Sequence, residues 1–355
     1  MNFPIQRTTQ LKPLPPADDL QFGRHFTDHV FYCAYSDVKG WHNPHIAPYG
    51  PISMPPSAAV FHYGQAMFEG LKAYRQQDGK VKLFRPDFNC DRMRSGAPRL
   101  CLPQVPVEIF LGGIRELVRL DERWVPSVQG SALYIRPTLI ATEGMIRARP
   151  ATEALFFILL CPVGPYFKGR TGPVRIYVED HDVRAVPGGL GSTKASANYV
   201  ASFASAMRAV QKGFDQVLWL NADHSAVEEV GTMNIFFVFD DEIVTPALNG
   251  SILPGGMRDS VLRLLRKRGR SVSERRITIE EVVQKQKGGH LREVFGTGTA
   301  AAISPVGEFT FQGQTYKVES PTSETTAAYL LDEITGLQYG HKPDEFKWMR
   351  DLDSL

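Results

Sequence analysis

The order of apolar and polar positions along the chain predicts a mixture of strands and helices. Short apolar runs rich in β-branched and aromatic residues indicate buried strands. These runs cover residues 81–84, 131–140, 154–163, 174–178, 216–220 and 234–239. Apolar residues that recur three and four positions apart indicate helices. These segments cover about 106–120, 197–212, 257–268, 278–285 and 325–337. Thr278 and Glu281 have the spacing of a capping box at the start of the fourth helix.

The length of 355 residues suggests about two domains. Residues 1–20 are polar and Pro-rich and are expected to form an arm over the surface. Residues 164–173 hold three glycines and two prolines and are the preferred interdomain linker. The expected organisation is a small domain over 21–163 and a larger domain over 174–355, with an α+β architecture.

Charge and composition exclude several functional classes. Lysine and arginine total 40 against 38 acidic residues, and the two signs are interspersed. This balance lacks the concentrated basic face of a nucleic-acid-binding protein. The basic stretch at 263–270 is interpreted as the solvated side of a helix. Four histidines near the N-terminus (25, 29, 42 and 45) have no cysteine or carboxylate cluster beside them, so no metal site is expected.

The cysteines, the apolar runs and the N-terminal segment indicate the cellular compartment. Four scattered cysteines without a CxxC pair predict reduced thiols. The longest apolar run, 154–163, is shorter than the ~20 residues of a membrane helix. The N-terminal segment has no apolar core of a secretion signal. A cytoplasmic protein is expected.

Lys194 is the first candidate for chemistry. It follows a run of glycines, and no other charged residue lies within nine positions on either side. Such surroundings desolvate a lysine, which lowers its pKa and makes the amine a nucleophile able to form a Schiff base. An ordinary surface lysine is the alternative. A phosphate loop does not fit, because Thr193 stands where the Walker pattern requires glycine.

Polar residues beside buried strands supply further candidates. Glu229 and Asn234 flank a strand that is otherwise apolar. A buried carboxylate requires a partner, which is either a structural cation or the ring nitrogen of a cofactor. Tyr199, five residues after Lys194, either points a phenol into the same site or is a half-buried helix tyrosine.

Two glycine-rich segments have the character of phosphate-binding sites. ILPGGMRDSVLRLL (252–265) places Pro-Gly-Gly before a helix, where backbone N–H groups attract anions. EVFGTGTAAAIS (293–304) leads from a strand into a loop of N–H groups and hydroxyls. Glycine-rich turns are common, so neither segment alone is specific for a phosphate site. Arg92 is a candidate for the charged partner of such a phosphate.

Together these segments resemble the branched-chain amino-acid aminotransferases of fold-type IV, which use pyridoxal 5′-phosphate. The resemblance runs over about residues 20–342 with almost uniform spacing. Its segments are FHYGQAMFEGLKAYR (61–75), LFRPDFNCDRM (83–93), SALYIRPTLIA (131–141), CPVGPYF (161–167), RAVPGGLGSTKASANY (184–199), QVLWL (216–220), EVGTMNIF (229–236), ILPGGMR (252–258) and FGTGTA (295–300).

The resemblance implies a role for each matching residue. Lys194 holds the cofactor as a Schiff base and moves the proton at the substrate Cα, while Glu229 pairs with the pyridine nitrogen. The further cofactor-binding residues implied are Arg92, Tyr199, Thr232, Leu253, Gly256, Met257 and Thr299. The implied substrate-binding residues are Tyr63, Phe68, Tyr134, Arg136, Tyr166 and Ala300, with Met145 and Ile146 reaching the pocket of the partner subunit in a homodimer.

The implied reaction moves the amino group of leucine, isoleucine or valine to 2-oxoglutarate in two half-reactions. The mammalian members carry a CxxC pair after the Gly-x-Gly-Thr-Ala loop, and Ala301 and Ser304 stand there in this chain. Control by oxidation of that pair is therefore not expected. Two alternatives stay open: a D-amino-acid aminotransferase or lyase of the same fold, and a phosphate-binding regulatory module without catalysis.

Overall fold

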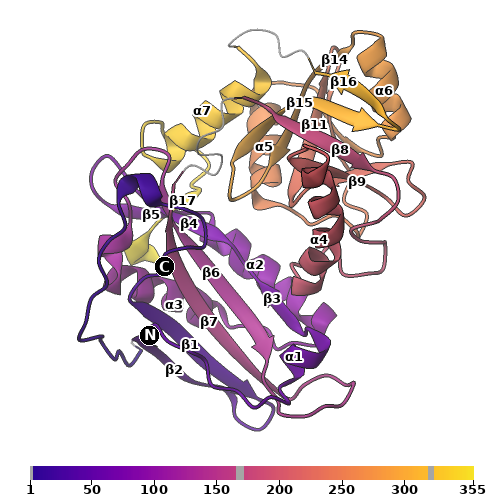
Figure 1. Ribbon diagram of the computed structural model, residues 1–355. Coiled ribbons are helices and arrows are strands. Elements are labelled where there is room, and N and C mark those ends of the chain that lie inside the picture. Colours follow the sequence, from indigo (N-terminus) through magenta and orange to yellow (C-terminus); the bar gives the residue numbers. More distant parts are fainter. Residues whose placement is uncertain (1–2, 165–171, 319–323) are drawn as a thin grey trace. The chain divides into compact units, whose positions relative to one another are not determined.

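The computed structural model describes residues 3–164, 172–318 and 324–355 (Figure 1). The chain forms two compact units. The first contains residues 1–168, 193–196 and 335–355, and the second contains residues 169–192 and 197–334. Most of the linker expected at 164–173 lies outside the described residues.

The first unit is built on an antiparallel sheet of eight strands. Its strands are β1 (His29–Ser36), β2 (Gly40–Pro48), β3 (Ala66–Phe68), β4 (Leu71–Arg75), β5 (Val81–Phe84), β6 (Ala132–Ala141), β7 (Glu153–Val163) and β17 (Met349–Asp351). The order across the sheet is β17-β5-β4-β6-β7-β1-β2, and β3 pairs with β6. The runs expected to form strands at 81–84, 131–140 and 154–163 are thus confirmed as β5, β6 and β7.

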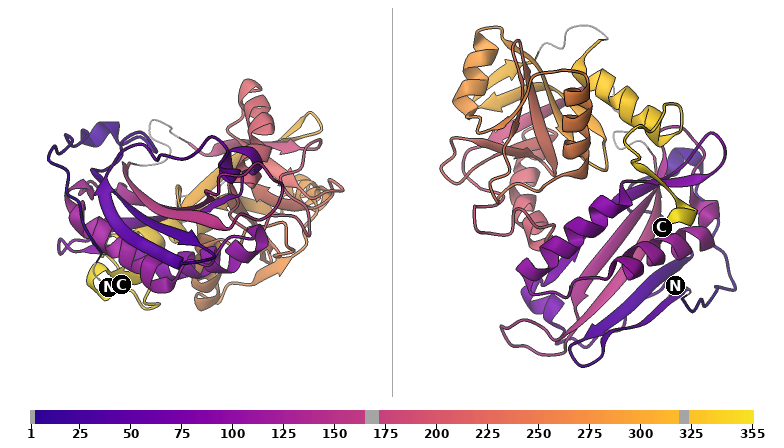
Figure 2. Two further views of the ribbon diagram at one scale, coloured as in Figure 1. Left: turned by 90° about the horizontal axis from the view of Figure 1, so that it is seen from below. Right: turned by 180° about the vertical axis from the view of Figure 1, so that it is seen from behind.

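Helices α2 (Pro86–Gly96) and α3 (Val107–Leu120) cover one face of this sheet, and the short α1 (Ala59–Tyr63) precedes β3 (Figure 2). The helix expected at 106–120 is confirmed as α3, which begins after Pro106. Its residues Phe110, Ile114 and Leu117 are fully buried, and each such burial contributes about 1.5–3 kcal/mol. Gly113 permits the close approach, because a Cβ there would lie 2.9 Å from the ring of Phe31.

The N-terminal arm adds a short parallel bridge to the first unit. The N–H groups of Gln6 and Ile46 donate to the carbonyls of Ile46 and Pro4, each at 2.9 Å. Phe3 is buried with its ring 5.0 Å from that of Phe31. Within the segment expected to form an arm, Phe3, Pro4 and Gln6 are therefore held to the first unit.

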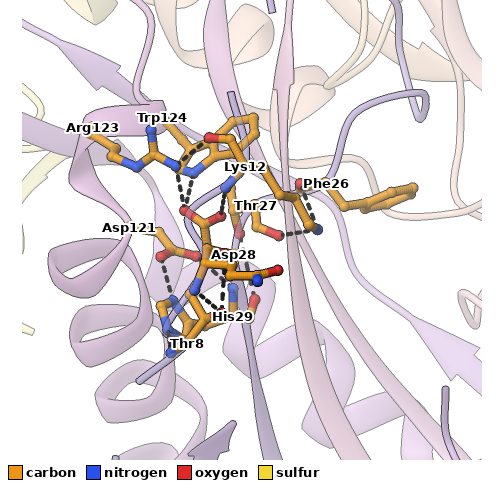
Figure 3. A network of polar contacts seen from close by, with 10 residues as sticks. Thr8, Lys12, Phe26, Thr27, Asp28, His29, Asp121, Arg123 and Trp124 are labelled. Atoms are coloured by element: carbon orange, nitrogen blue, oxygen red, sulfur yellow. Dashed lines mark hydrogen bonds and ion pairs between the residues drawn. The ribbon is translucent and has the colours of Figure 1, made fainter. Parts of the chain in front are cut away.

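Two buried carboxylates hold the next part of the arm (Figure 3). The N–H of Thr8 donates to Nε2 of His29 at 3.0 Å, and Nδ1 of His29 lies 2.7 Å from Asp121. Because Nε2 accepts a hydrogen bond, the ring proton is on Nδ1 and points at Asp121. The N–H of Lys12 donates to Asp28 at 2.9 Å, and Arg123 donates to the same carboxylate at 2.7 Å.

The C-terminal part of the chain returns to the first unit. Strand β17 pairs antiparallel with β5, and Trp348 is buried beside Phe84. The sequence placed residues 335–355 and Lys194 in the larger domain, whereas the structure places both in the first unit. In each case the physical reason is backbone pairing, of β17 with β5 and of Ala195 with Met67. A strand of three residues such as β17 has no distinctive sequence pattern.

The second unit is built on a mixed sheet of nine strands. They are β8 (Val174–Glu179), β9 (Gln216–Leu220), β10 (Val227–Val230), β11 (Met233–Phe239), β12 (Ile243–Pro246), β13 (Val272–Arg275), β14 (Leu291–Thr297), β15 (Ile303–Phe311) and β16 (Gln314–Lys317). Strand β10 pairs with both β9 and β11, so that β8, β9, β10, β11, β14 and β15 close into a ring. The expected strands at 174–178, 216–220 and 234–239 are confirmed.

The helices α4 (Ser196–Gln211), α5 (Gly256–Lys267), α6 (Ile279–Lys287) and α7 (Thr326–Gln338) match the expected segments within two residues. The Thr278 hydroxyl accepts the N–H of Glu281 at 3.0 Å, as the capping pattern predicts. In the described parts of the chain, no helix has the length and apolar character needed to cross a membrane.

Candidate active site

Lys194 is held against β3 of the first unit. Met67 and Ala195 form an antiparallel bridge, and the N–H of Phe68 donates to the carbonyl of Lys194 at 3.2 Å. These contacts place the ammonium group over the Phe68 ring, with Nζ 5.0 Å from the ring centre. The lysine side chain is therefore fixed by a strand and does not extend from a free surface loop.

The surroundings of Lys194 disfavour its charged form. Burial, followed by the positive charge of Arg92, lowers the pKa of Lys194 from 10.5 to about 8, although the charge of Glu69 acts in the opposite direction. The desolvation expected from the small, uncharged neighbours in the sequence is thus the leading cause. An amine with this pKa is unprotonated in a useful fraction near neutral pH.

Glu69 is fully buried and organises the basic groups around it. Arg92 donates to both of its carboxylate oxygens at 2.7 Å, from Nε and Nη2. Asn89 donates to Oε2 at 2.7 Å. Burial alone would raise the pKa of Glu69, but the charge and hydrogen bonds of Arg92, the charge of Lys194 and the Asn89 amide hold that pKa below its usual value. Glu69 is therefore an anion between two cations.

Aromatic side chains and a second arginine also belong to the candidate site of the first unit. Tyr134 accepts a hydrogen bond from Nη2 of Arg136 at 2.9 Å. The guanidinium of Arg136 lies 4.4 Å from the centre of the Phe68 ring. Gly70 leaves room for this phenol, since a Cβ there would lie 2.1 Å from the Tyr134 oxygen. Lys72 lies opposite Tyr134 in the β4–β6 ladder, and burial lowers its pKa to about 8.

The second unit carries a buried carboxylate at Glu229. Strands β10 and β11 place it opposite Asn234. Its Oε1 accepts the N–H of Leu253 at 2.8 Å, and its Oε2 lies 3.2 Å from Nε of Arg184. Both side chains of this ion pair are buried. The Glu229 carboxylate, which was predicted to need a partner, therefore has Arg184 as a structural cation. It also lies at the end of the β10–β11 strand pair, beside a glycine-rich loop.

Two loops of the second unit present groups suited to an anion. Helix α5 begins at Gly256 and Met257, and Gly255 is required there because a Cβ would lie 2.0 Å from the Asn234 side-chain oxygen. At the end of β14, Thr297 is buried, and its hydroxyl has no hydrogen-bond partner among the described residues. Thr297 directly precedes the loop that contains Thr299 and Ala300, both partly exposed.

The remaining candidates are placed as follows. Tyr199 is half-buried in the first turns of α4, and Thr232 is exposed in the turn between β10 and β11. In the first unit, Tyr63 is 45% exposed at the end of α1. Met145 and Ile146 are 38% and 67% exposed between β6 and β7. Tyr166 lies outside the described residues.

Glu69, Lys72 and Arg184 were not among the residues predicted from the sequence. A signal exists for Glu69, because this acidic residue interrupts an apolar strand segment and precedes a glycine. Lys72 follows two residues after that glycine, in a strand whose alternate positions are apolar. Arg184 is ten residues before Lys194, and only the folded loop brings it to Glu229.

Comparison with known proteins gives consistent matches. The family model described as amino-transferase class IV matches residues 66–309, more than half of the chain. The Bacillus subtilis (strain 168) protein named branched-chain-amino-acid aminotransferase 2 is 48% identical over 352 residues, which cover 99% of this chain and 97% of that protein.

Solved structures agree with the fold. The branched-chain amino acid aminotransferase of Escherichia coli superposes with a TM-score of 0.75 at 22% identity, covering 92% of this chain and 99% of its own. The branched-chain amino acid aminotransferase of T.th., complexed with N-(5′-phosphopyridoxyl)-L-glutamate, has a TM-score of 0.73 at 25% identity, with 90% and 98% of the two chains covered. The expected α+β fold is confirmed.

Proposed function

This chain belongs to the amino-transferase class IV family, and from that premise we propose that it transfers the amino group of L-leucine, L-isoleucine or L-valine to 2-oxoglutarate and back. The proposed cofactor is pyridoxal 5′-phosphate. The branched-chain substrates named for the similar Bacillus subtilis protein support this choice. The bound phosphopyridoxyl-glutamate of the T.th. protein supports the cofactor class and the glutamate half-reaction.

The observation that carries the proposal is the environment of Lys194. A lysine whose pKa is lowered to about 8, held over an aromatic ring and beside an Arg–Glu pair, has the properties of an amine that bonds to a carbonyl. A surface lysine has neither the desolvation nor the fixed position. This combination favours a Schiff-base enzyme over a phosphate-binding module without catalysis.

The second unit carries groups that would suit the ring nitrogen and the phosphate of such a cofactor. Glu229 offers a buried carboxylate that a ring N–H can meet, and its bonds to Leu253 and Arg184 fix its orientation. The phosphate would be held by the N–H groups of Gly256 and Met257 at the start of α5. The hydroxyl of Thr297, which lacks a described partner, is a further donor beside the same glycine-rich loops. The donor set therefore suits an anionic, ring-containing group.

The other assignments follow the resemblance of the sequence motifs. Tyr199 would donate to the phenolic oxygen of the cofactor, and Arg92, Thr232 and Thr299 would contact its phosphate. In the structure Arg92 is tied to Glu69 through two hydrogen bonds. Glu69 therefore fixes the direction in which the guanidinium points before any anion arrives.

When bound, the cofactor ring accepts the electron pair left at the substrate Cα after proton loss. Lys194 is the base for this proton, because its lowered pKa provides a fraction of unprotonated amine near neutral pH and its backbone is bound to β3. Glu229, held by Leu253 and Arg184, would pair with the ring nitrogen. The N–H of Ala300 would hold the substrate carboxylate.

Substrate selection is assigned to the aromatic part of the site. Phe68 and Tyr134 offer apolar walls to a branched side chain, and Tyr63 and Tyr166 are assigned there by the resemblance. Arg136, bound to the Tyr134 hydroxyl, is the cation that can receive the distal carboxylate of glutamate. One pocket can then accept both substrate types, since the arginine interacts with a phenol when an alkyl group occupies the site.

The active form is proposed to be a homodimer in which Met145 and Ile146 enter the site of the partner subunit. Both are apolar and exposed in one loop, which is an unfavourable arrangement for a solvated surface. Arg149 holds this loop by donating to Glu143 at 2.5 Å. A loop that is held in place while showing apolar side chains is suited to a contact with another chain.

The visible absorption spectrum of the purified protein tests this proposal. A band in the region of roughly 400 nm, typical of a Schiff base with this cofactor, should be lost when L-leucine is added and should return with 2-oxoglutarate. The Lys194→Ala variant is the control and should lack the response. A protein without the band after incubation with pyridoxal phosphate, or a response to D-leucine alone, would contradict the proposal.

A further inference from the structure

Strand β10 carries two consecutive glutamates, and the structure buries both. Glu228 and Glu229 are 1% and 3% exposed. Successive side chains of a regular strand point to opposite faces of the sheet. Strand β10 departs from this rule, because it advances two residues, from 227 to 229, while its partner β9 advances one, from 220 to 219. Glu228 is thus the extra residue of a β-bulge, a feature that changes the direction of side chains in a strand.

The two carboxylates bind the same loop, residues 249–253, which we call the 249–253 loop. Glu228 accepts hydrogen bonds from the Asn249 amide at 3.1 Å and from the Ser251 hydroxyl. Glu229 accepts the N–H of Leu253 at 2.8 Å. The loop is therefore held at its beginning and at its end by neighbouring side chains of one strand.

The 249–253 loop also contacts two other parts of the second unit. Arg184, which forms the ion pair with Glu229 at 3.2 Å, donates from Nη2 to the carbonyl of Ser251. The N–H of Ser192 donates to the carbonyl of Gly250 at 3.2 Å. A shift of the loop would therefore move both groups that hold Glu229, the guanidinium and the backbone N–H.

Glu228 is an unfavourable residue for the stability of the sheet. Among the described residues it forms no ion pair, and its Oε2 has no hydrogen-bond partner. Burying a carboxylate without a cation destabilises a folded protein. Because a neutral side chain would suit the fold better at this position, the contacts of Glu228 with the 249–253 loop point to a role in the site and not in stability.

We propose that Glu228 is a positioning residue for Glu229. By holding Asn249 and Ser251, it fixes the 249–253 loop and thereby the orientation in which Glu229 meets the ring nitrogen of the cofactor. This inference rests on the proposed function, because the ring nitrogen is the group that Glu229 contacts. Side chains that orient a metal ligand from behind change affinity or activity by about 10–100-fold, and the Glu228→Ala variant is expected at the lower end of that range.

The binding affinities of pyridoxal 5′-phosphate and of its deaza analogue, in which a C–H group replaces the ring nitrogen, test this role. The preference for the natural cofactor measures the contact between Glu229 and that nitrogen, and Glu229→Ala should remove it. Glu228→Ala should lower the preference several-fold, because a displaced Glu229 meets the nitrogen less well. A general loosening of the fold would weaken both compounds equally, and an unchanged preference in Glu228→Ala would overturn the inference.

Three further variants separate positioning from structure. Glu228→Gln should keep most of the preference, since its amide oxygen can accept the same hydrogen bonds. Ser251→Ala removes one of those bonds from the loop side and should lower the preference, which keeps the test decisive if Glu228→Ala does not fold. Glu293→Ala is the matched control, because Glu293 is a buried glutamate of the same unit that accepts the N–H groups of Thr326 and Ala327 at 2.7 and 2.9 Å. An equal loss of preference in Glu293→Ala would reduce Glu228 to a structural residue.

A double-mutant cycle tests whether Glu228 acts through Glu229. Glu228→Ala should slow the leucine half-reaction about tenfold in the otherwise unaltered protein and should add almost nothing in the Glu229→Ala background. Equal fold losses in the two backgrounds would overturn the inference. If the unaltered protein bound neither pyridoxal 5′-phosphate nor the deaza analogue, the aminotransferase assignment itself would fail, so the two failures are distinguishable.

Discussion

Replacing Lys194 by methionine should stabilise the cofactor-free protein while abolishing transamination. The pKa of Lys194 is about 8 in the folded chain, against 10.5 for a solvated lysine. This difference of about 2.5 units corresponds to a cost of about 3 kcal/mol for keeping the ammonium group in the folded state at pH 7. Methionine has a similar length and no charge, so the variant does not carry this cost.

The pH dependence of the stability difference tests whether the charge of Lys194 causes it. Below pH 8 both folded and unfolded states hold the proton, and the folded state carries the full cost. Between pH 8 and 10.5 only the unfolded state holds it, so the stability of the unaltered protein rises with pH relative to the variant. The advantage of Lys194→Met should therefore fall from about 3 kcal/mol at pH 7 to about 1 kcal/mol at pH 10.

Urea unfolding of the cofactor-free proteins, followed by tryptophan fluorescence at both pH values, measures this advantage. Lys80→Met serves as the control, because Lys80 is an exposed lysine of the same unit and its replacement should change stability by less than about 0.5 kcal/mol. An advantage of equal size at pH 7 and pH 10, or a variant less stable than the unaltered protein at pH 7, would refute the reasoning.

Four further predictions concern the site. Glu69→Gln removes the charge that raises the pKa of Lys194, so the acidic limb of the pH–rate profile should move to lower pH, and the unpaired arginine should reduce stability by about 3 kcal/mol in urea unfolding. Glu229→Ala should lower kcat by several orders of magnitude, and a loss below tenfold would make this carboxylate purely structural. Arg136→Gln should weaken glutamate and 2-oxoglutarate more than leucine, and equal losses of kcat/KM in the two half-reactions would contradict that role. Mild peroxide should inactivate the enzyme little, because burial raises the pKa of the other three thiols and only Cys101 is exposed; an inactivation reversed by thiols would show that a cysteine controls activity.

The larger elements were predictable because their patterns are local. Strand β9 coincides with the apolar run at 216–220, and α6 follows from the Thr278 cap and its apolar spacing. Strands β10 and β12 have only four residues each, and pairing with neighbours distant in sequence defines them. Local patterns do not contain that information.

The residues of the candidate site also fall into those with a local sequence signal and those defined by long-range contacts. Lys194 stood out because it is a charged residue among small, uncharged ones, and Glu229 because it precedes an otherwise apolar strand. Glu69 was missed although it is completely buried, since its partner Arg92 is 23 residues further along the chain. The attachment of Lys194 to β3 depends on a bridge between Met67 and Ala195. Sequence motifs therefore predicted the candidate reacting groups, while the groups that position them depended on long-range contacts.

The first unit is built from three separate stretches of the chain, which affects its folding during synthesis on the ribosome. Strand β5 occupies residues 81–84, but its neighbour β17 is translated only after the whole second unit. During that interval the nascent sheet exposes the backbone donors and acceptors of β5 along one edge, where another nascent chain can pair. The segment with Lys194, which pairs with β3 in the folded chain, is translated before β17. Chaperone engagement during elongation is accordingly expected to concentrate on this unfinished edge and to end when β17 emerges from the exit tunnel.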